Sequence, residues 1–181
     1  MRIEDISGKK FGLLGRFFRR KSGVTSVEMA MLALPFLTIL FAIIETGYMF
    51  FLAIMLEGAT GDAARQIRTG SVQQSGSPLV QFQAVLCDRL FGMIQCPAKV
   101  VVDVRNYSRF DAANPPAMAG NQAGSTFAPG NPGDVIVVRV AYTWNFITPL
   151  LSNALANADG GTRTFVASAA FRNEPYAGPL N

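Results

Sequence analysis

The sequence contains no histidine among its 181 residues, and charged residues make up only 15% of it. Histidine is the most frequent general base and a common zinc ligand, and two cysteines supply only half of a tetrahedral zinc site. The chain also lacks a Gly-x-Ser-x-Gly motif, a Walker motif and an evident pair of catalytic carboxylates. We therefore expect a protein that is not an enzyme and that binds no metal, cofactor or small-molecule substrate.

The net charge of +4 and the pI of 9.4 come from the N-terminal end of the chain. Seven of the 16 cations precede Gly23, against two acids, so the rest of the chain carries nine cations and ten acids. A basic cluster beside an apolar segment is typical of the cytoplasmic flank of a membrane helix and attracts anionic lipids. Since the basic charge is local to this flank, we expect no nucleic-acid partner.

One apolar run, Met29–Leu56, is interrupted only by Thr38, Glu45, Thr46 and Gly47. As a helix it would extend about 40 Å, more than the roughly 30 Å of a bilayer core. It is too long for the apolar part of a cleaved signal peptide, and no good Ala-x-Ala site follows closely. The sequence therefore predicts a cytoplasmic leader (1–23), a transmembrane helix that continues beyond the membrane (24–70) and a domain on its far side (71–181).

The exported part has patterns typical of an α+β domain with about three antiparallel strands. Three- and four-residue apolar spacings predict helices, and alternation of β-branched residues predicts strands. We expect a long helix over 26–69, helices over 79–91 and 148–156, and strands over 99–107, 135–146 and 162–171. The segment 111–132 is rich in Ala, Asn, Gly and Pro, which predicts a long loop that either binds a partner or lies over the surface.

Two cysteines, Cys87 and Cys96, lie in this exported part with Gly92 between them. Disulfides persist in oxidising compartments, and a bridge over so short a loop stabilises the fold by roughly 2–3 kcal/mol in the chain-entropy model. We expect a disulfide here, with two unpaired, small apolar side chains as the alternative.

Several motifs together resemble those of the TadE-like proteins, which are minor pilins (pseudopilins) of bacterial Tad (Flp, tight-adherence) pili, related to type IV pili. The motifs are Gly23-Val24-Thr25-Ser26-Val27-Glu28, Pro35, Glu45-Thr46-Gly47, Ala63-Ala64-Arg65, Thr69-Gly70 and Arg172-Asn173-Glu174-Pro175-Tyr176. The two cysteines before a valine-rich strand also fit this family. The resemblance extends from about Gly23 to Tyr176 and is most specific in the N-terminal helix.

The resemblance implies that a prepilin peptidase cuts after Gly23, which makes Val24 the new N-terminus. It also implies a pseudopilin-like fold, a location in the bacterial inner membrane with the C-terminal domain in the periplasm, and incorporation into an extracellular pilus as a further possibility. The implied partners are the inner membrane, the prepilin peptidase, other Tad minor pilins and the major Flp pilin. The implied function is pilus assembly and adhesion, including biofilm formation.

Glu28 becomes the fifth residue of the processed chain, and in pilins this carboxylate is thought to pair with the terminal amine of a neighbouring subunit. In apolar surroundings such a pair favours one register, because a misaligned pair leaves both charges without a partner. The alternative is a carboxylate stabilised only by the dipole of the first helical turn. Met29 stands where the major pilins of this system have tyrosine, which favours a minor component.

Glu45 lies about 24 Å along the helix from Met29, in the outer half of the bilayer or near its surface. Acidic residues at such a depth usually face a partner or water, so we expect Glu45 and Gly47 to contact the helix of another pilin. An acid that extends outward to the interface is the alternative. Pro35 is expected to kink the helix or to loosen its hydrogen bonding.

Two other functions are compatible with the sequence. The first is a bitopic inner-membrane envelope protein that keeps its leader and binds a partner through its periplasmic domain. The second is a binding module or adhesin that an ordinary signal peptidase releases, with its mature N-terminus beyond the apolar run. The position of the mature N-terminus distinguishes all three.

Overall fold

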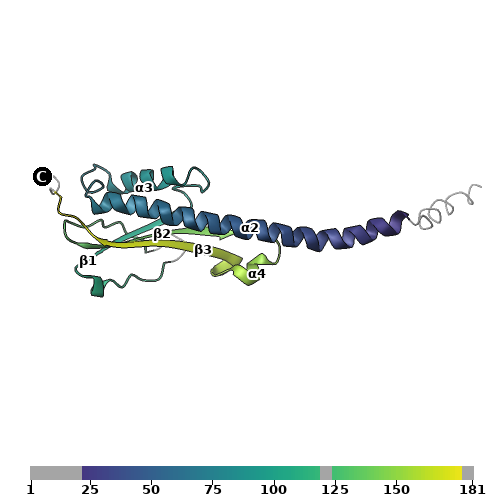
Figure 1. Ribbon diagram of the computed structural model, residues 1–181. Coiled ribbons are helices and arrows are strands. Elements are labelled where there is room, and N and C mark those ends of the chain that lie inside the picture. The colour runs from purple at the N-terminus through teal and green to yellow at the C-terminus, as the bar shows by residue number, and fades with distance from the viewer. Residues whose placement is uncertain (1–21, 119–123, 177–181) are drawn as a thin grey trace, which may run out of the picture. The chain divides into compact units, whose positions relative to one another are not determined.

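The computed structural model describes residues 22–118 and 124–176, so the basic leader lies outside the described residues. The chain divides into two compact units, Met1–Ile44 and Glu45–Asn181. Its elements, labelled as in Figure 1, are α2 (Ser22–Arg68), α3 (Pro78–Arg89), β1 (Val100–Tyr107), η1 (Phe110–Ala112), β2 (Val135–Asn145), α4 (Leu151–Leu155), η2 (Asp159–Gly161) and β3 (Thr162–Arg172). The predicted α+β class, with a long first helix and three antiparallel strands, is confirmed.

In the first unit, α2 exposes apolar side chains around its whole circumference. Large exposed side chains there are Val27, Met29, Met31, Leu32, Leu34, Phe36, Leu37, Ile39, Leu40, Phe41, Ile43 and Ile44. Helical structure continues unbroken through Pro35, and the Thr38 hydroxyl donates a hydrogen bond to the Leu34 carbonyl (2.9 Å). A helix that is apolar on every side and that no other described segment covers is typical of a membrane span. Its mean hydropathy of 2.3 over 18 residues fits a single-pass membrane protein.

At Glu45, where the second unit begins, one side of α2 becomes buried. The buried residues recur every three or four positions: Met49, Leu52, Leu56, Ala59, Ala63 and Ile67. Residues 24–44 rise about 31 Å as a helix, so the portion before Glu45 alone matches the roughly 30 Å of a bilayer core. The C-terminal part of the predicted run, residues 45–56, already belongs to the domain.

The sheet of the second unit has the strand order β1-β2-β3, and all neighbours are antiparallel. Val102 lies opposite Val140, and Val138 lies opposite Ala169. In Figure 1, α2 and α3 lie on the same side of this sheet. That face supplies buried residues to the core, namely Val100, Val102, Val104, Ile136, Val138, Val140 and Ala167, which meet Phe82 and Leu86 of α3 and the buried side of α2. The three strands predicted from the alternation are confirmed, with ends that differ by at most one residue from those expected.

The long segment between β1 and β2 follows the sheet instead of standing free. The Val104 N–H donates to the Thr126 carbonyl (2.7 Å), and the Ala128 N–H donates to the Val104 carbonyl (2.8 Å). Phe127, which lies between Thr126 and Ala128 in the chain, packs edge-on against Phe82, with 5.6 Å between the ring centroids. Residues 126–128 therefore extend the sheet beyond β1, and the described part of this loop has a structural role.

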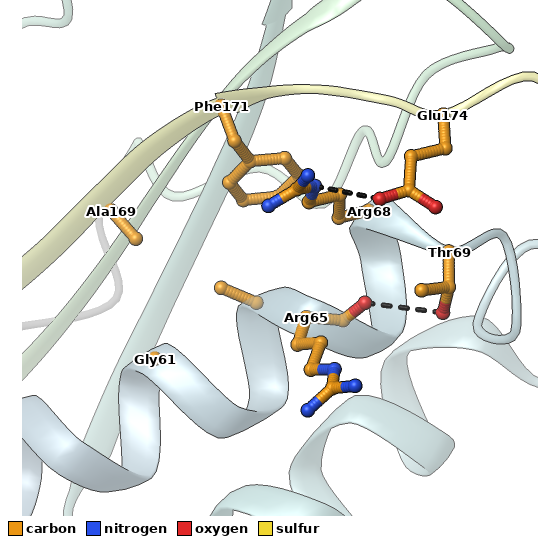
Figure 2. Close-up of a pocket in the computed structure, with 8 residues that line it drawn as sticks. Gly61, Arg65, Arg68, Thr69, Ala169, Phe171 and Glu174 are labelled. Carbon is orange, nitrogen blue, oxygen red and sulfur yellow. Dashed lines mark hydrogen bonds and ion pairs between the residues drawn. The ribbon is translucent and has the colours of Figure 1, made fainter.

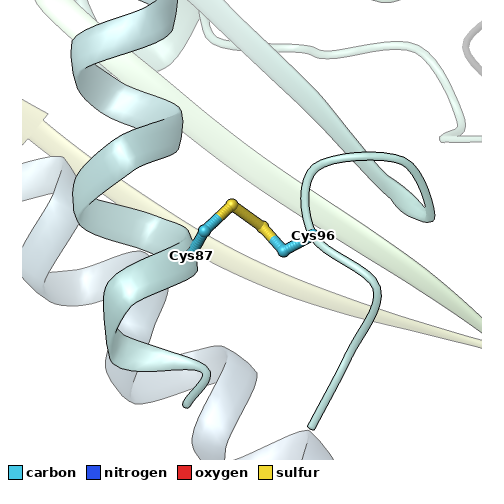
Figure 3. Close-up of a disulfide and its surroundings, with 2 residues drawn as sticks. All are labelled: Cys87 and Cys96. Carbon is cyan, nitrogen blue, oxygen red and sulfur yellow. A yellow bond between two sulfur atoms is a disulfide. The ribbon is translucent and has the colours of Figure 1, made fainter. Parts of the chain in front are cut away.

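A disulfide joins Cys87 in α3 to Cys96 in the connection to β1 (Figure 3), as predicted. Their Cα atoms are 5.5 Å apart. The chain reverses direction between them at Gly92, whose φ of +72° lies in the left-handed region that favours glycine. The disulfide thus fixes the end of α3 against the start of the sheet.

Candidate functional site

Gly23, the predicted processing position, lies in the first turn of α2 and is exposed. Apart from its two chain neighbours and the nearby backbone of its own helix, no described atom lies within 4 Å of the point where a side chain would begin. The leader on one side of the predicted cleavage bond lies outside the described residues, and processing after Gly23 stays a prediction.

Glu28 is exposed on α2, and no described residue makes a hydrogen bond or ion pair with its side chain. Its neighbour Met29 is 67% exposed. An ionised carboxylate on an otherwise apolar helix is costly inside a membrane unless a cation or a donor meets it. A cation or hydrogen-bond donor from outside the described residues would therefore lower the free energy of the Glu28 carboxylate inside a membrane.

Glu45 has abundant partners, and they all come from the second unit. One carboxylate oxygen accepts hydrogen bonds from the Trp144 indole N–H (3.1 Å) and the Ile147 backbone N–H (2.7 Å). The other accepts one from the Thr148 backbone N–H (2.8 Å). Only 7% of Glu45 is exposed. The carboxylate therefore binds the end of β2 and the segment that follows it to α2.

Trp144 is held from a second direction by Tyr48, one helical turn beyond Glu45. The two rings meet edge to face, with 5.6 Å between their centroids. Such pairs contribute about 0.5–1.5 kcal/mol beyond the area they bury. Glu45 was recognisable in the sequence as an acid within an apolar run, and Trp144 as the single tryptophan. No pattern in the sequence indicated that these two residues, 99 positions apart, would form a hydrogen bond.

Gly47, predicted with Glu45 to contact another helix, faces away from this network. It is exposed, and so are Gly58 and Gly61 farther along α2, with open space where each side chain would begin. This side of α2 lets a second helix approach closely. The predicted helix contact stays a prediction.

The face of the sheet opposite α2 carries a buried ion pair. Asp103 of β1 lies opposite Arg139 of β2, and the Arg139 Nε donates to Asp103 at 3.2 Å. Arg105 and the Thr126 N–H also donate to this carboxylate, at 3.0 Å and 2.9 Å, and Arg139 donates to the Pro116 carbonyl. Asp103 is 2% exposed. The cluster thus holds the loop after β1 against the outer face of the sheet.

Burial raises the pKa of Asp103, but the hydrogen bonds from Arg139, Arg105 and the Thr126 N–H lower it by more. The pKa of this carboxyl therefore lies below its ordinary value. With its carboxylate ionised and fully bonded, this cluster is suited to hold structure and not to transfer protons.

An open groove of about 520 Å³ lies between the last turns of α2 and the end of β3 (Figure 2). Its lining residues are Gly61, Ala64, Arg65, Arg68, Thr69, Ala169, Phe171 and Glu174. The Arg68 guanidinium pairs with Glu174 at 3.0 Å, and both side chains are about half exposed. The groove contains no nucleophile with an adjacent base, and no cluster of three or more metal-ligating residues occurs in the described part of the chain.

Comparison with known proteins gives one match. Residues 23–65 match the sequence model of a family described as TadE-like protein. No curated protein and no solved structure matches the chain. The match begins at Gly23, includes Glu28, Glu45 and Gly47, and ends at Arg65. The predicted resemblance of the later motifs, up to Tyr176, stays a prediction. The predicted resemblance is confirmed over residues 23–65, where this chain is similar to the TadE-like family.

Proposed function

We propose that the protein is a minor pilin of a Tad (Flp) pilus that a prepilin peptidase processes after Gly23. The mature chain is held in the inner membrane by residues 24–44, with its α+β domain in the periplasm. There it contacts other minor pilins and the major pilin during assembly and contributes to adhesion. The observation that carries the proposal is the family match, which begins at Gly23 and follows a helix whose large apolar side chains are exposed up to Ile44.

Glu28 supports this function through its lack of a partner among the described residues. Cleavage after Gly23 creates a cationic amine at Val24, four residues before Glu28 and about 6 Å along the helix axis. A subunit shifted along its neighbour by this distance brings its amine to the neighbour's Glu28. In apolar surroundings every other register leaves both charges unpaired, so the pair selects a register even where its net stabilisation is small.

The exposed surface of α2 supports contact with other helices. The apolar residues before Glu45 can meet lipid first and neighbouring pilin helices after assembly. Gly47 permits close approach on this surface. The Glu45 carboxylate is bound within its own domain. In a contact between pilin helices we therefore expect it to act indirectly, by orienting the end of β2.

The N-terminal sequence of the protein purified from membranes of its native cell tests the proposal. Val24 at the N-terminus supports processing by a prepilin peptidase. An intact Met1 contradicts processing and favours the bitopic envelope protein that keeps its leader. A terminus beyond Leu56 contradicts both and favours release by an ordinary signal peptidase.

A further inference from the structure

Two large apolar side chains are exposed in the segment that joins β2 to α4. Ile147 is 81% exposed and Leu150 is 74% exposed. Leu150 also has a φ of +69°, in the left-handed region that branched side chains rarely adopt. No contact within the described chain compensates for this conformation by burying the side chain. Residues held in such sparsely populated backbone conformations cluster at functional sites.

The segment is fixed to one particular point of α2. The backbone N–H groups of Ile147 and Thr148 both donate to the Glu45 carboxylate. Glu45 directly follows Ile44, the last residue of the exposed apolar portion and of the first unit. The exposed pair is therefore held beside the residue at which the apolar helix ends and the domain begins.

We propose that Ile147 and Leu150 insert into the lipid–water interface of the bilayer that α2 crosses. This gives the domain a second attachment to the membrane besides the helix itself. The inference requires that α2 spans a bilayer, but it does not depend on processing or on a pilus.

The composition of the segment favours lipid as the occupant. Residues 144–151 contain no charged side chain, so no charge has to leave water on insertion. Trp144 and Tyr48, the ring pair at Glu45, are the two residue types enriched at membrane interfaces. Single exposed apolar residues are common on soluble proteins. Here two of them, a strained backbone and an aromatic pair lie together at the end of a membrane helix.

Trp144 is the only tryptophan and so reports directly on this site. The full-length protein is reconstituted in phosphatidylcholine–phosphatidylglycerol vesicles, and vesicles carrying it are isolated by flotation. Tryptophan quenching is then measured with lipids brominated near the headgroup end or near the middle of the acyl chains. The double variant Ile147→Asn/Leu150→Asn keeps the Glu45 hydrogen bonds to the backbone, and asparagine tolerates the positive φ at 150. Val80→Asn, at a 64% exposed position on α3, is the matched control.

We expect shallow bromines to quench Trp144 more than deep ones. The double variant should lower this quenching at least about twofold, because the segment loses its apolar contact with lipid. Val80→Asn should leave the quenching unchanged. Equal quenching in the wild type and the double variant overturns the proposal.

A second measurement places the reporter on the segment itself. In a Trp144→Phe background, Ile147→Trp is compared with Val80→Trp in the same vesicles. Quenching by shallow bromines at position 147 and not at position 80 supports the proposal. Equal quenching at both positions overturns it, as does a tryptophan at 147 shielded from both bromolipid and aqueous quencher, which indicates a protein contact.

Discussion

The Glu45 carboxylate and the Trp144 indole N–H are joined by a 3.1 Å hydrogen bond between two residues 99 positions apart. The same carboxylate accepts two backbone N–H groups from residues 147 and 148. This single side chain therefore connects the first covered turn of α2 with the end of the central strand. It fixes where the domain begins on the long helix.

Replacing Glu45 with alanine should destabilise the domain by about 3 kcal/mol, because three donors lose a buried, charged acceptor. Glu45→Gln should cost less, since the amide keeps one acceptor oxygen. Thermal unfolding of the full-length protein in detergent, followed by Trp144 fluorescence, measures both effects. Glu57→Gln, at an exposed position of the same helix, is the control. Equal stability of Glu45→Ala and the wild type would show that these hydrogen bonds contribute nothing net.

Replacing Asp103 with asparagine should destabilise the domain by about 3–5 kcal/mol, because Arg139 is left as a buried charge without its partner. The side chains of Asp103 and Arg139 are 3% and 11% exposed. Asp111→Asn is the matched control, since it breaks a pair with Arg109 in which both side chains are at least 74% exposed. That pair should contribute less than about 1 kcal/mol. Chemical denaturation of both variants measures the difference, and similar losses would contradict a special role for the buried pair.

The lowered pKa of Asp103 predicts how stability responds to acid. The folded-state pKa lies below the ordinary value of an aspartate, so the folded protein binds this proton less readily than the unfolded chain does. The contribution of Asp103 is therefore complete above its unfolded pKa and is lost as the pH falls through its folded pKa. Denaturation midpoints measured over this acidic range should fall more steeply for the wild type than for Asp103→Asn. Parallel curves would assign the acid sensitivity to other carboxyl groups.

The sequence predicted those parts of the fold in which one side of an element differs from the other. Alternating valines in β1 and β2 predicted both strands, and Val102 and Val138 from one side of this alternation enter the core. The same method could not locate the end of the membrane portion. Residues 45–56 are apolar on both sides of the helix, with Leu52 buried and Ile54 69% exposed, so periodicity changes little at Glu45.

The contacts of Glu45 and of Phe127 could not be predicted from the sequence either. Glu45 was identified from its cost in an apolar run, but its donors are two backbone N–H groups and one indole, and backbone groups have no sequence identity. The pairing of Phe127 with the edge of β1 was missed because a single bridge in a segment rich in Gly and Pro has no alternation. Both features depend on tertiary contacts between residues far apart in the chain.

Replacing Gly23 with leucine should leave the leader attached, because the proposed processing depends on the glycine at the cleavage bond. Gly61→Leu is the matched control, since this glycine is also exposed on α2 with open space around it but lies far from the predicted bond. Mass spectrometry of each variant purified from native membranes measures the leader directly. We expect the uncut chain for Gly23→Leu and a chain beginning at Val24 for Gly61→Leu. Normal pili built from an uncut Gly23→Leu protein would show that processing at this position is not required. The exposed surface of α2 would then have to contact neighbouring helices while the basic leader is still attached.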